Sequence, residues 1–370
     1  MPPSGGGTEI KMRDEKMIKE LMHRVFVRTT NMDFSWNWGG GVAFYGIVRA
    51  WEVTGDDEYI EYLKGWVDNY LEEGLPEFTI NTIALGYTVL ALYKYTGDEK
   101  YMDIAKSQAE FLTNKTIRFG DGVYQHTVSE KNYNFDEQAW ADTLFMAGLF
   151  MVKIGALLDN RQYFDDGMNQ FHWHIEYLQN IKNGLFYHGW DNVNKNNMSA
   201  IHWCRANGWA AITMAEAMHL SDAFNPVFVE MMDALRDQMA ALSRLQDAGG
   251  MWHTIVDDDS SYCETSGSCA IATAMIKFCV DGGHLLYKKN ILRAADAIIA
   301  EIDDTGMVMN VSGGTAVMHD EDGYKKIPHT RIQGWGQGLA LAFLAELMLF
   351  DEKIGHTEAA PEKKPKGGKK

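Results

Sequence analysis

The sequence predicts an all-α fold in which six helical hairpins close into one ring, an (α/α)6 barrel. The first observation behind this prediction is an internal repeat, because residues 54–59 (TGDDEY) match residues 96–101 (TGDEKY) at a shift of 42 positions. An apolar helical pattern precedes and follows each copy. The second observation is that only 7 of 370 residues are proline, which suits a helix-rich chain. Repeats of this spacing predict stacked helix pairs.

Each copy of the repeat predicts a helix, a tight turn and a second helix. Gly55 and Gly97 are placed to end the first helix, and Asp56 and Asp98 to begin the second. Weaker copies of the turn lie at residues 158–163, 220–222 and 280–283. An N-terminal helix is expected at residues 14–28. A sixth inner helix is expected at residues 338–350 and should end at Asp351-Glu352. Such hairpins stack openly or close into a ring, and we expect closure.

The loops at the other end of the hairpins are long and rich in glycine and aromatic residues. They span residues 34–41, 119–135, 184–208, 249–267 and 306–336. Loops of this length in a compact domain usually build a site, so we expect one functional face. One (α/α)6 domain is expected over residues 11–355, with disordered ends at residues 1–10 and 356–370.

Charge and cysteine usage exclude several classes of protein. Lys+Arg 34 against Asp+Glu 51 gives a formal net charge of -17, and such a surface repels nucleic acids. Cys204, Cys263, Cys269 and Cys279 lack a paired CxxC spacing, which favours buried thiols over zinc or disulfides. No apolar run reaches the roughly 18–20 residues of a membrane span, and charged residues follow the N-terminus where a signal peptide is apolar. We expect a cytoplasmic protein without a membrane partner.

One carboxylate, Asp142, lies at the start of a strongly apolar helix. Trp140 stands two residues before it, and the apolar run 144–146 (LFM) follows. We expect burial to raise the pKa of Asp142 toward the value that a general acid needs at neutral pH. The alternative is that Asp136 caps this helix and that Asp142 is a polar residue satisfied by a loop.

Two further clusters carry side chains suited to a sugar acid. His188 lies among aromatic residues in LFYHGWD, and Arg205 lies between Trp203 and Trp209 in WCRANGW. Indole rings stack on flat ligands, and a guanidinium pairs with a carboxylate. The alternative for each cluster is aromatic packing at the surface. The sequence has no HExxH, no P-loop and no GxGxxG in a βαβ setting, so we expect no metal and no organic cofactor.

Several motifs, taken in order, resemble a known family. They are GVYQH at 122–126, QAWADTL at 138–144, GLFYHGW at 184–190, WCRANGW at 203–209, SYCETS at 261–266, VSGGT at 311–315 and GQG at 336–338. The similarity runs over residues 36–346 and resembles glycoside hydrolase family 105, the unsaturated rhamnogalacturonyl hydrolases. The related unsaturated glucuronyl hydrolases share the ring fold and part of the site.

The resemblance implies a glycoside hydrolase that removes a 4,5-unsaturated uronic acid from the non-reducing end of a lyase-generated oligosaccharide. The implied reaction is hydration, in which Asp142 protonates C4 of the enol ether and then accepts a proton from the water that attacks C5. The resulting hemiketal opens and releases the second sugar. One carboxyl group acts in turn as acid and base, so no second catalytic carboxylate is required.

The resemblance also implies the residues of the substrate pocket. They are Trp38, Asn81, His126, Trp140, His188, Trp203, Arg205 and Trp209. Arg205 and His188 are expected to hold the uronate and position water, while the indole rings stack on the sugar. Asn81 is a departure, because many members carry aspartate there, and the lost charge removes one contribution that keeps the proton on Asp142. Asn81 either substitutes by hydrogen bonding or marks a branch with another substrate or pH preference.

Two other functions are compatible with the same residues. A sugar epimerase or isomerase uses the same kind of ring and needs two histidines across the cavity, which His126, His188 and His253 offer. A carbohydrate receptor without activity explains the aromatic residues but not a carboxylate placed as Asp142 is. The sugar linked to the uronate, the parent polysaccharide and the oligomeric state stay open at this point.

Overall fold

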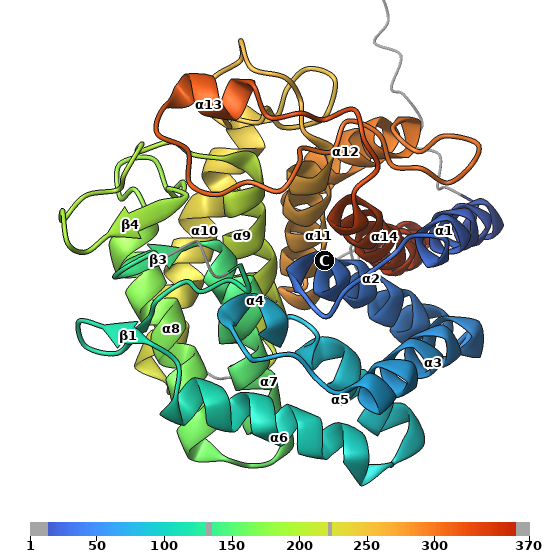
Figure 1. The fold of residues 1–370 in the computed structure, drawn as a ribbon. Coiled ribbons are helices and arrows are strands. Elements are labelled where there is room, and N and C mark those ends of the chain that lie inside the picture. Colours follow the sequence, from blue (N-terminus) through green and yellow to red (C-terminus); the bar gives the residue numbers. More distant parts are fainter. Residues whose placement is uncertain (1–13, 131–134, 221–223, 360–370) are drawn as a thin grey trace, which may run out of the picture.

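Two concentric layers of helices make up the ring (Figure 1). The computed structural model describes residues 14–130, 135–220 and 224–359. The inner helices are α2 (Trp38–Thr54), α5 (Gly86–Thr96), α7 (Leu149–Leu157), α9 (Cys204–Ala217), α11 (Thr265–Asp281) and α14 (Gly334–Ala359). The outer helices are α1 (Glu15–Thr30), α3 (Asp57–Glu73), α6 (Glu99–Asn114), α8 (Arg161–Leu178), α10 (Pro226–Leu245) and α12 (Lys288–Ala300). Inner and outer helices alternate along the chain, as the hairpin repeat predicts.

The inner layer closes on itself. Each inner helix packs against the next, and α14 returns to α2. The α2–α14 crossing requires glycine, because a Cβ on Gly46 would stand 1.9 Å from the Gly338 carbonyl oxygen, and a Cβ on Gly338 would stand 2.1 Å from that of Val42. The ring therefore closes through direct contact between the backbones of α2 and α14. The prediction of a closed (α/α)6 barrel is confirmed.

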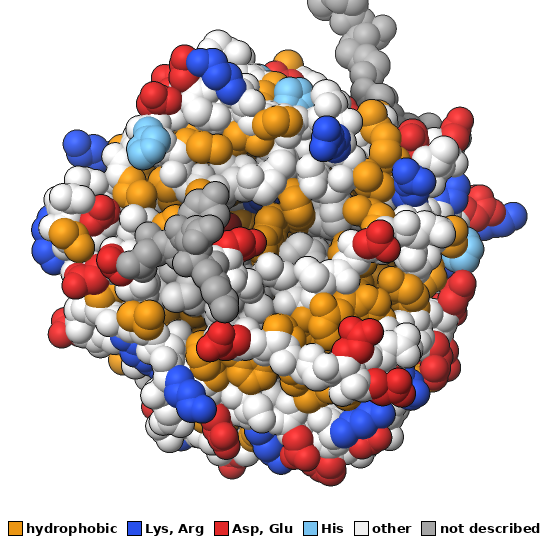
Figure 2. All heavy atoms as spheres, viewed as in Figure 1, with side chains coloured by type: hydrophobic (Ala, Val, Ile, Leu, Met, Phe, Trp, Pro, Cys, Tyr) orange, Lys and Arg blue, Asp and Glu red, His pale blue; other side chains and the backbone are white. Residues whose placement is uncertain are grey.

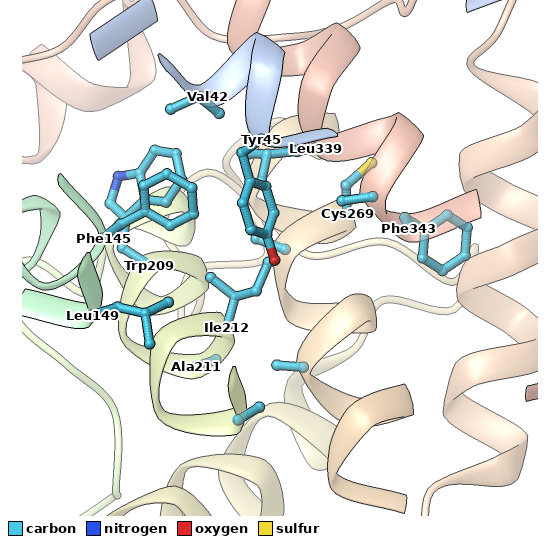
Figure 3. Packing of buried hydrophobic residues seen from close by; sticks show 14 of the residues in the cluster. Val42, Tyr45, Phe145, Leu149, Trp209, Ala211, Ile212, Cys269, Leu339 and Phe343 are labelled. Atoms are coloured by element: carbon cyan, nitrogen blue, oxygen red, sulfur yellow. The ribbon is translucent and has the colours of Figure 1, made fainter. Parts of the chain in front are cut away.

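Burial distinguishes the two layers. Every residue of α9 is buried, whereas α12 buries a single stripe at helical spacing, Ile291, Ala294, Ala295 and Ile298. Apolar side chains from the inner helices, such as Tyr45 and Trp209, pack inside the ring with Phe145 from the turn before α7 (Figure 3). No helix within the described ranges combines the length and apolarity that a membrane crossing requires.

The turns between helices follow the repeat found in the sequence. Gly55 ends α2 with a φ of 68° and Gly97 ends α5 with a φ of 69°, a left-handed conformation that glycine adopts without steric cost. Asp56 and Asp98 then cap α3 and α6 by accepting backbone N–H groups of the first turn. Both predicted hairpin turns are confirmed.

Two predictions about the chain boundaries need comment. α14 does not end at Asp351-Glu352 but continues to Ala359, because neither residue breaks a helix and the next proline is Pro361. The predicted tail therefore begins too early, at 356. The expected disordered residues 1–10 and 360–370 lie outside the described residues, as do residues 221 and 222 of one predicted turn.

Several short helices and strands lie at the end of the ring where the inner helices begin. They are α4 (Ile80–Ile83), the π-helical turn η1 (Leu144–Gly148), α13 (Glu321–Lys325), and the strands β1 (Arg118–Phe119), β2 (Val123–Tyr124), β3 (Gln138–Trp140) and β4 (Gly189–Asp191). β1 pairs with β2 and β3 with β4, both antiparallel. On this face apolar side chains gather around the centre and charged side chains around the margin (Figure 2).

Charged side chains cluster at the opposite end, where the inner helices finish. Glu216 of α9 pairs with Lys153 of α7 at 2.7 Å and with Lys277 of α11 at 2.9 Å. Glu346 of α14 pairs with Lys277 at 3.1 Å and with Nε of Arg49 of α2 at 3.1 Å. A cavity of about 950 Å³ opens beside these five residues, which we call the basal charge cluster. Five inner helices are thus tied together by ion pairs at one end.

Candidate active site

The predicted pocket residues gather where inner helices begin. One residue of the site lies in the first turn of each inner helix or in the segment just before it: Trp38 (α2), Asn81 (α4, before α5), Asp142 (before η1 and α7), Arg205 (α9), Ser266 (α11) and Trp335 (α14). The N-terminal end of a helix carries a partial positive charge and unpaired N–H groups. Six such ends at one end of the ring favour an anionic ligand.

Strand pairing brings Asp142 and His188 together. β3 and β4 pair in a register that places Trp140 opposite Gly189, and the Ala141 N–H donates to the His188 carbonyl oxygen at 3.0 Å. Nε2 of His188 then stands 3.3 Å from Oδ2 of Asp142. Two motifs that are distant in sequence therefore supply one polar pair.

Asp142 is largely enclosed at the start of its helical segment. Its side chain is 14% exposed, and the His188 side chain is fully buried. The separation of 3.3 Å exceeds the ~2.7–2.9 Å of a charge-assisted hydrogen bond, so the pair is close but not tightly bonded. Strand β3 lies between Asp136 and the helix, so Asp136 does not cap it and that alternative is wrong.

The pKa of Asp142 lies below its ordinary value in this structure. Burial raises the pKa of the carboxyl group, as the sequence predicted, but the hydrogen bond and charge of His188, with His126 and Arg205, lower it by more. The expectation of a raised pKa is therefore wrong for the isolated chain, because it counted burial and omitted the neighbours. Asp142 is ionised here at neutral pH.

His126 lies on the other side of Trp140 from His188. The His126 ring stacks on the Trp140 indole with centroids 4.3 Å apart and an interplanar angle of 11°, and the His188 ring is 5.7 Å from the same indole. Nδ1 of His126 is 3.0 Å from the Thr143 hydroxyl oxygen, and burial lowers the pKa of His126 to about 4. A histidine that stays neutral is a poor acid at neutral pH, which argues against an isomerase that shuttles protons between His126 and His188 or His253.

Arg205 is held firmly by two loops. Its Nη1 donates to the Ser312 carbonyl (3.1 Å) and hydroxyl (2.6 Å) and to the Ser266 hydroxyl (3.2 Å), and its Nη2 donates to the Gly313 carbonyl (2.8 Å). The guanidinium lies 4.3 Å from the centroid of the Trp203 ring. No acceptor among the described residues bonds to Nε or to the second N–H of Nη2. A carboxylate can accept from a fork of two N–H groups of this kind, and the Arg205 side chain is 1% exposed in the isolated chain.

Glu264 is a second buried carboxylate, and its oxygens are fully occupied. Oε1 accepts from the Ser266 N–H (3.1 Å), the Ser266 hydroxyl (2.7 Å) and the Ser312 N–H (3.0 Å), and Oε2 accepts from the Gly267 N–H (2.6 Å). It also lies 3.9 Å from Nη1 of Arg205. Glu264 caps α11 and anchors the loop around Arg205, and it has no exposed surface with which to meet a substrate.

Trp38 and Trp335 form a half-buried aromatic wall near Arg205. Their ring centroids are 4.3 Å apart with an interplanar angle of 30°, and Nε1 of Trp335 donates to the Ser312 carbonyl at 3.0 Å. The Arg205 guanidinium lies 5.6 Å from the Trp335 ring. Trp38, a predicted pocket residue, therefore contacts Trp335, which in turn lies against Arg205, and its role in binding stays a prediction.

Trp203 and Trp209 are completely buried. The Trp203 ring packs against His188 with centroids 4.3 Å apart, and the Trp209 ring packs against Phe145 with centroids 4.7 Å apart. In this conformation both indoles support residues of the site or the core. Their stacking on a sugar stays a prediction.

Asn81 lies beside the Asp142 helix, because α4 packs against η1. Its backbone N–H donates to the Thr127 carbonyl oxygen at 3.3 Å, and its side chain is 7% exposed. The side-chain amide bonds to none of the residues that the structure describes. The role of Asn81 stays a prediction.

The sequence analysis missed five residues that complete the site: Glu264, Ser266, Ser312, Tyr324 and Trp335. The first three and Trp335 lie in or next to motifs singled out for the family resemblance, so their neighbourhood was marked although their roles were not. Tyr324 lies in the polar run EDGYKK, and its hydroxyl is 2.7 Å from Nδ1 of His188. Only the length of the 306–336 loop indicated that this segment matters.

Cysteine and acidic side chains form no candidate metal site in the described ranges, where no three His, Cys, Asp or Glu residues converge. The four thiols are free. Cys204, Cys269 and Cys279 are buried and Cys263 is half-buried. The prediction of buried thiols is confirmed for three of them.

The chain belongs to glycosyl hydrolase family 88, which it matches over residues 10–350. It is therefore a glycoside hydrolase.

Three proteins of known sequence or structure are similar to this chain over most of its length. The chain is 49% identical over 341 residues to "Unsaturated rhamnogalacturonyl hydrolase YesR" of Bacillus subtilis, covering 92% of this chain and 98% of that protein. A crystal structure described as a possible member of the GH105 family from Salmonella enterica superposes with a TM-score of 0.86 at 28% identity, covering 94% of this chain and 99% of that one. An unsaturated glucuronyl hydrolase specific for heparin shares the fold, with a TM-score of 0.70, 14% identity, and coverage of 93% and 99%.

Proposed function

We propose that this protein removes a 4,5-unsaturated uronic acid from the non-reducing end of a lyase-generated oligosaccharide by hydrating the C4=C5 bond. The observation that carries the proposal concerns the two buried carboxylates in the described part of the site, of which Asp142 alone has an oxygen without a hydrogen-bond partner. Asp142 stands beside His188, whereas Glu264 is saturated and closed off. A two-carboxylate glycosidase needs a second free acid at about 5–9.5 Å, while hydration needs one group that is acid and then base.

The proposed chemistry uses one carboxyl group twice, first as an acid and then as a base. Asp142 donates its proton to C4, which leaves positive charge shared between C5 and the ring oxygen. Water adds to C5 and returns a proton to the Asp142 carboxylate. The hemiketal formed at C5 then opens and releases the second sugar. The Asp142 carboxyl group ends the cycle as it began.

The uronate carboxylate has two roles in this proposal. It binds the free fork of Arg205, where the helix N-termini add favourable charge. It also offsets the positive charge of Arg205, which is one of the groups that lower the pKa of Asp142. Substrate binding therefore raises the pKa of the carboxyl group and favours the protonated acid. The ionised Asp142 of the isolated chain is compatible with an acid role for this reason.

The direct test is a panel of unsaturated disaccharides produced by polysaccharide lyases. Loss of the ultraviolet absorbance of the C4=C5 bond follows the hydration, and an isomerase leaves this bond intact. A rhamnose-linked disaccharide belongs in the panel, because a relative with 49% identity is named an unsaturated rhamnogalacturonyl hydrolase. No loss of absorbance with any member would refute the proposed function.

The variant Asp142→Asn tests the role of the carboxyl group. The amide keeps the shape but has no transferable proton, so kcat should fall on the order of 100- to 10,000-fold while substrate binding persists. Asp136→Asn is the matched control, because Asp136 is exposed and lies outside the helix. Near-native turnover by Asp142→Asn would remove Asp142 from the mechanism.

A further inference from the structure

Tyr324 reaches the Asp142–His188 pair from a distant part of the chain. It is the buried residue of α13, and the ion pair between Lys325 and Asp258 (2.5 Å) ties this short helix to the loop before α11. The Tyr324 side chain is completely buried, and its Oη lies 2.7 Å from Nδ1 of His188, 136 positions away in sequence. A continuous polar chain therefore runs from Tyr324 through His188 to Asp142.

The hydrogen bonds around Tyr324 decide where its proton points. Oη accepts from the Met318 N–H at 3.3 Å, so the phenol proton is available for Nδ1 of His188. Burial raises the pKa of Tyr324, which the Ser199 hydroxyl and the Met318 N–H oppose only in part. The phenol therefore keeps its proton at neutral pH and can donate it to Nδ1 of His188.

Donation from Tyr324 determines which ring nitrogen of His188 carries the proton. A neutral imidazole carries one proton, so when Nδ1 accepts from Tyr324 the proton is on Nε2. Nε2 faces Oδ2 of Asp142 at 3.3 Å, and Oδ2 is itself buried. Neither atom has a hydrogen-bond partner among the described residues, and a shorter separation lets Nε2–H donate to Oδ2 whether Asp142 is ionised or protonated. The acidic proton of Asp142 is consequently on Oδ1, the oxygen left to face a substrate.

We propose that Tyr324 is a positioning residue that fixes His188 as the Nε2–H tautomer and thereby directs the acidic proton of Asp142 to Oδ1. This inference rests on the proposed function, in which Asp142 is the acid. It also gives His188 a stabilising role, because its donation to Oδ2 strengthens as Asp142 loses its proton. The competing arrangement has Tyr324 donating to the unpartnered Ser199 hydroxyl and accepting from Nδ1–H of His188.

The first test is nitrogen-15 NMR of the histidine side chains in the wild-type protein at neutral pH, with His188→Gln used to assign the signals. The Nε2–H tautomer of His188 is expected. The Nδ1–H tautomer would overturn the inference, because it requires the competing arrangement. This measurement needs no substrate and stands whether or not the proposed function is correct.

The second test compares Tyr324→Phe with the wild type in kinetics. Loss of the donor should lower kcat by ~10- to 100-fold, the usual effect of removing a group that orients a catalytic ligand, and change KM by less than about threefold. Weaker donation from His188 raises the pKa of Asp142, so the alkaline limb of the kcat–pH profile should move to higher pH. The titratable and charged groups that face Asp142 are His188, His126 and Arg205.

Tyr101→Phe is the matched control. Tyr101 on the outer helix α6 is also completely buried, and its hydroxyl bonds to Asp68 at 2.7 Å. Both variants lose one buried hydroxyl, but only Tyr324→Phe should alter kcat and its pH dependence. Unchanged kinetics of Tyr324→Phe, with an active wild type and an inactive Asp142→Asn, would overturn this inference and leave the proposed function intact. A wild type inactive on every unsaturated uronide would instead refute the proposed function.

Discussion

Replacement of Glu216 by alanine should destabilise the ring by about 3 kcal/mol. Glu216 is buried in the basal charge cluster, where it pairs with Lys153 at 2.7 Å and Lys277 at 2.9 Å and accepts a hydrogen bond from the Tyr45 hydroxyl at 3.0 Å. Removing one partner of a buried ion pair leaves an uncompensated charge and costs about 3–5 kcal/mol. The variant removes the carboxylate that joins α7, α9 and α11.

The exposure of the two lysines sets the magnitude within that range. Lys277 keeps Glu346 at 3.1 Å after the substitution. Lys153 lines the basal cavity with 27% of its side chain exposed, so water takes up part of its charge. Both facts favour the lower end of the range. Glu216→Gln keeps the shape and loses the charge, so its cost should be smaller, at about 1.5–3 kcal/mol.

The free energy of unfolding in urea measures this effect. The control is Asp165→Asn, which breaks the exposed Arg161–Asp165 pair (2.8 Å, side chains 82% and 43% exposed) and should cost less than about 0.5 kcal/mol. A loss below about 1 kcal/mol for Glu216→Ala would refute the reasoning, because it would mean that water solvates both lysines. Asp142-dependent turnover of the folded variant should be unchanged.

The effect of Glu216 should also depend on pH. Burial raises the pKa of Glu216, but Lys153, Lys277 and Arg49 lower it well below the ordinary value of 4.5. A carboxyl group whose pKa is lower in the folded than in the unfolded chain stabilises the folded state at any pH above its unfolded pKa. This stabilisation is lost as the pH falls toward and through its pKa in the folded state. The stability difference between the wild type and Glu216→Gln should therefore shrink below about pH 4.5.

Three further predictions concern the active site. Arg205→Lys keeps the positive charge but loses the paired N–H groups of the guanidinium. Its kcat/KM on an unsaturated disaccharide should therefore fall by ~10- to 100-fold while its melting temperature stays similar. A large fall in melting temperature with a proportionate loss of activity would make Arg205 structural. The rate should fall as pH rises through the pKa of Asp142 in the complex, because the acid must be protonated, and a kcat that rises with pH above neutrality would contradict this. Exhaustive chelation should leave activity unchanged, and loss restored by one divalent ion would contradict the prediction that no metal is needed.

Local signals in the sequence predicted the hairpins, because each turn is encoded by adjacent residues. Gly55 and Asp56 end one helix and start the next without reference to the rest of the chain. Closure of the ring was an expectation whose cause is not local, since it depends on Gly46 meeting Gly338 across 292 positions. The end of α14 was misplaced because an Asp-Glu pair is not a stop signal.

The site was predictable to the extent that motifs coincide with helix starts. The motifs around Asp142, His188 and Arg205 each precede or open an inner helix, so a ring fold brings them to one end. The predicted direction of the Asp142 pKa shift is wrong, because the shift depends on which side-chain nitrogen atoms lie within a few ångströms of the carboxyl group, and the sequence does not show this. Tyr324 could not be found, because no sequence pattern links a tyrosine in a polar loop to a histidine in another.

The direction of the inner helices shapes the electric field at the active site. All six inner helices run in the same direction, so their positive N-terminal ends gather at the active site and their negative C-terminal ends at the base. At the base, Arg49, Lys153 and Lys277 lie before the last turns of their helices, and their charges are balanced by ion pairs with the two glutamates of the basal charge cluster. The active site combines the opposite helix ends with Arg205, an arrangement suited to an anionic sugar. A chain with a net charge of -17 can therefore bind an acidic substrate, because the field at the site comes from helix direction and one fixed guanidinium rather than from the sum of surface charges.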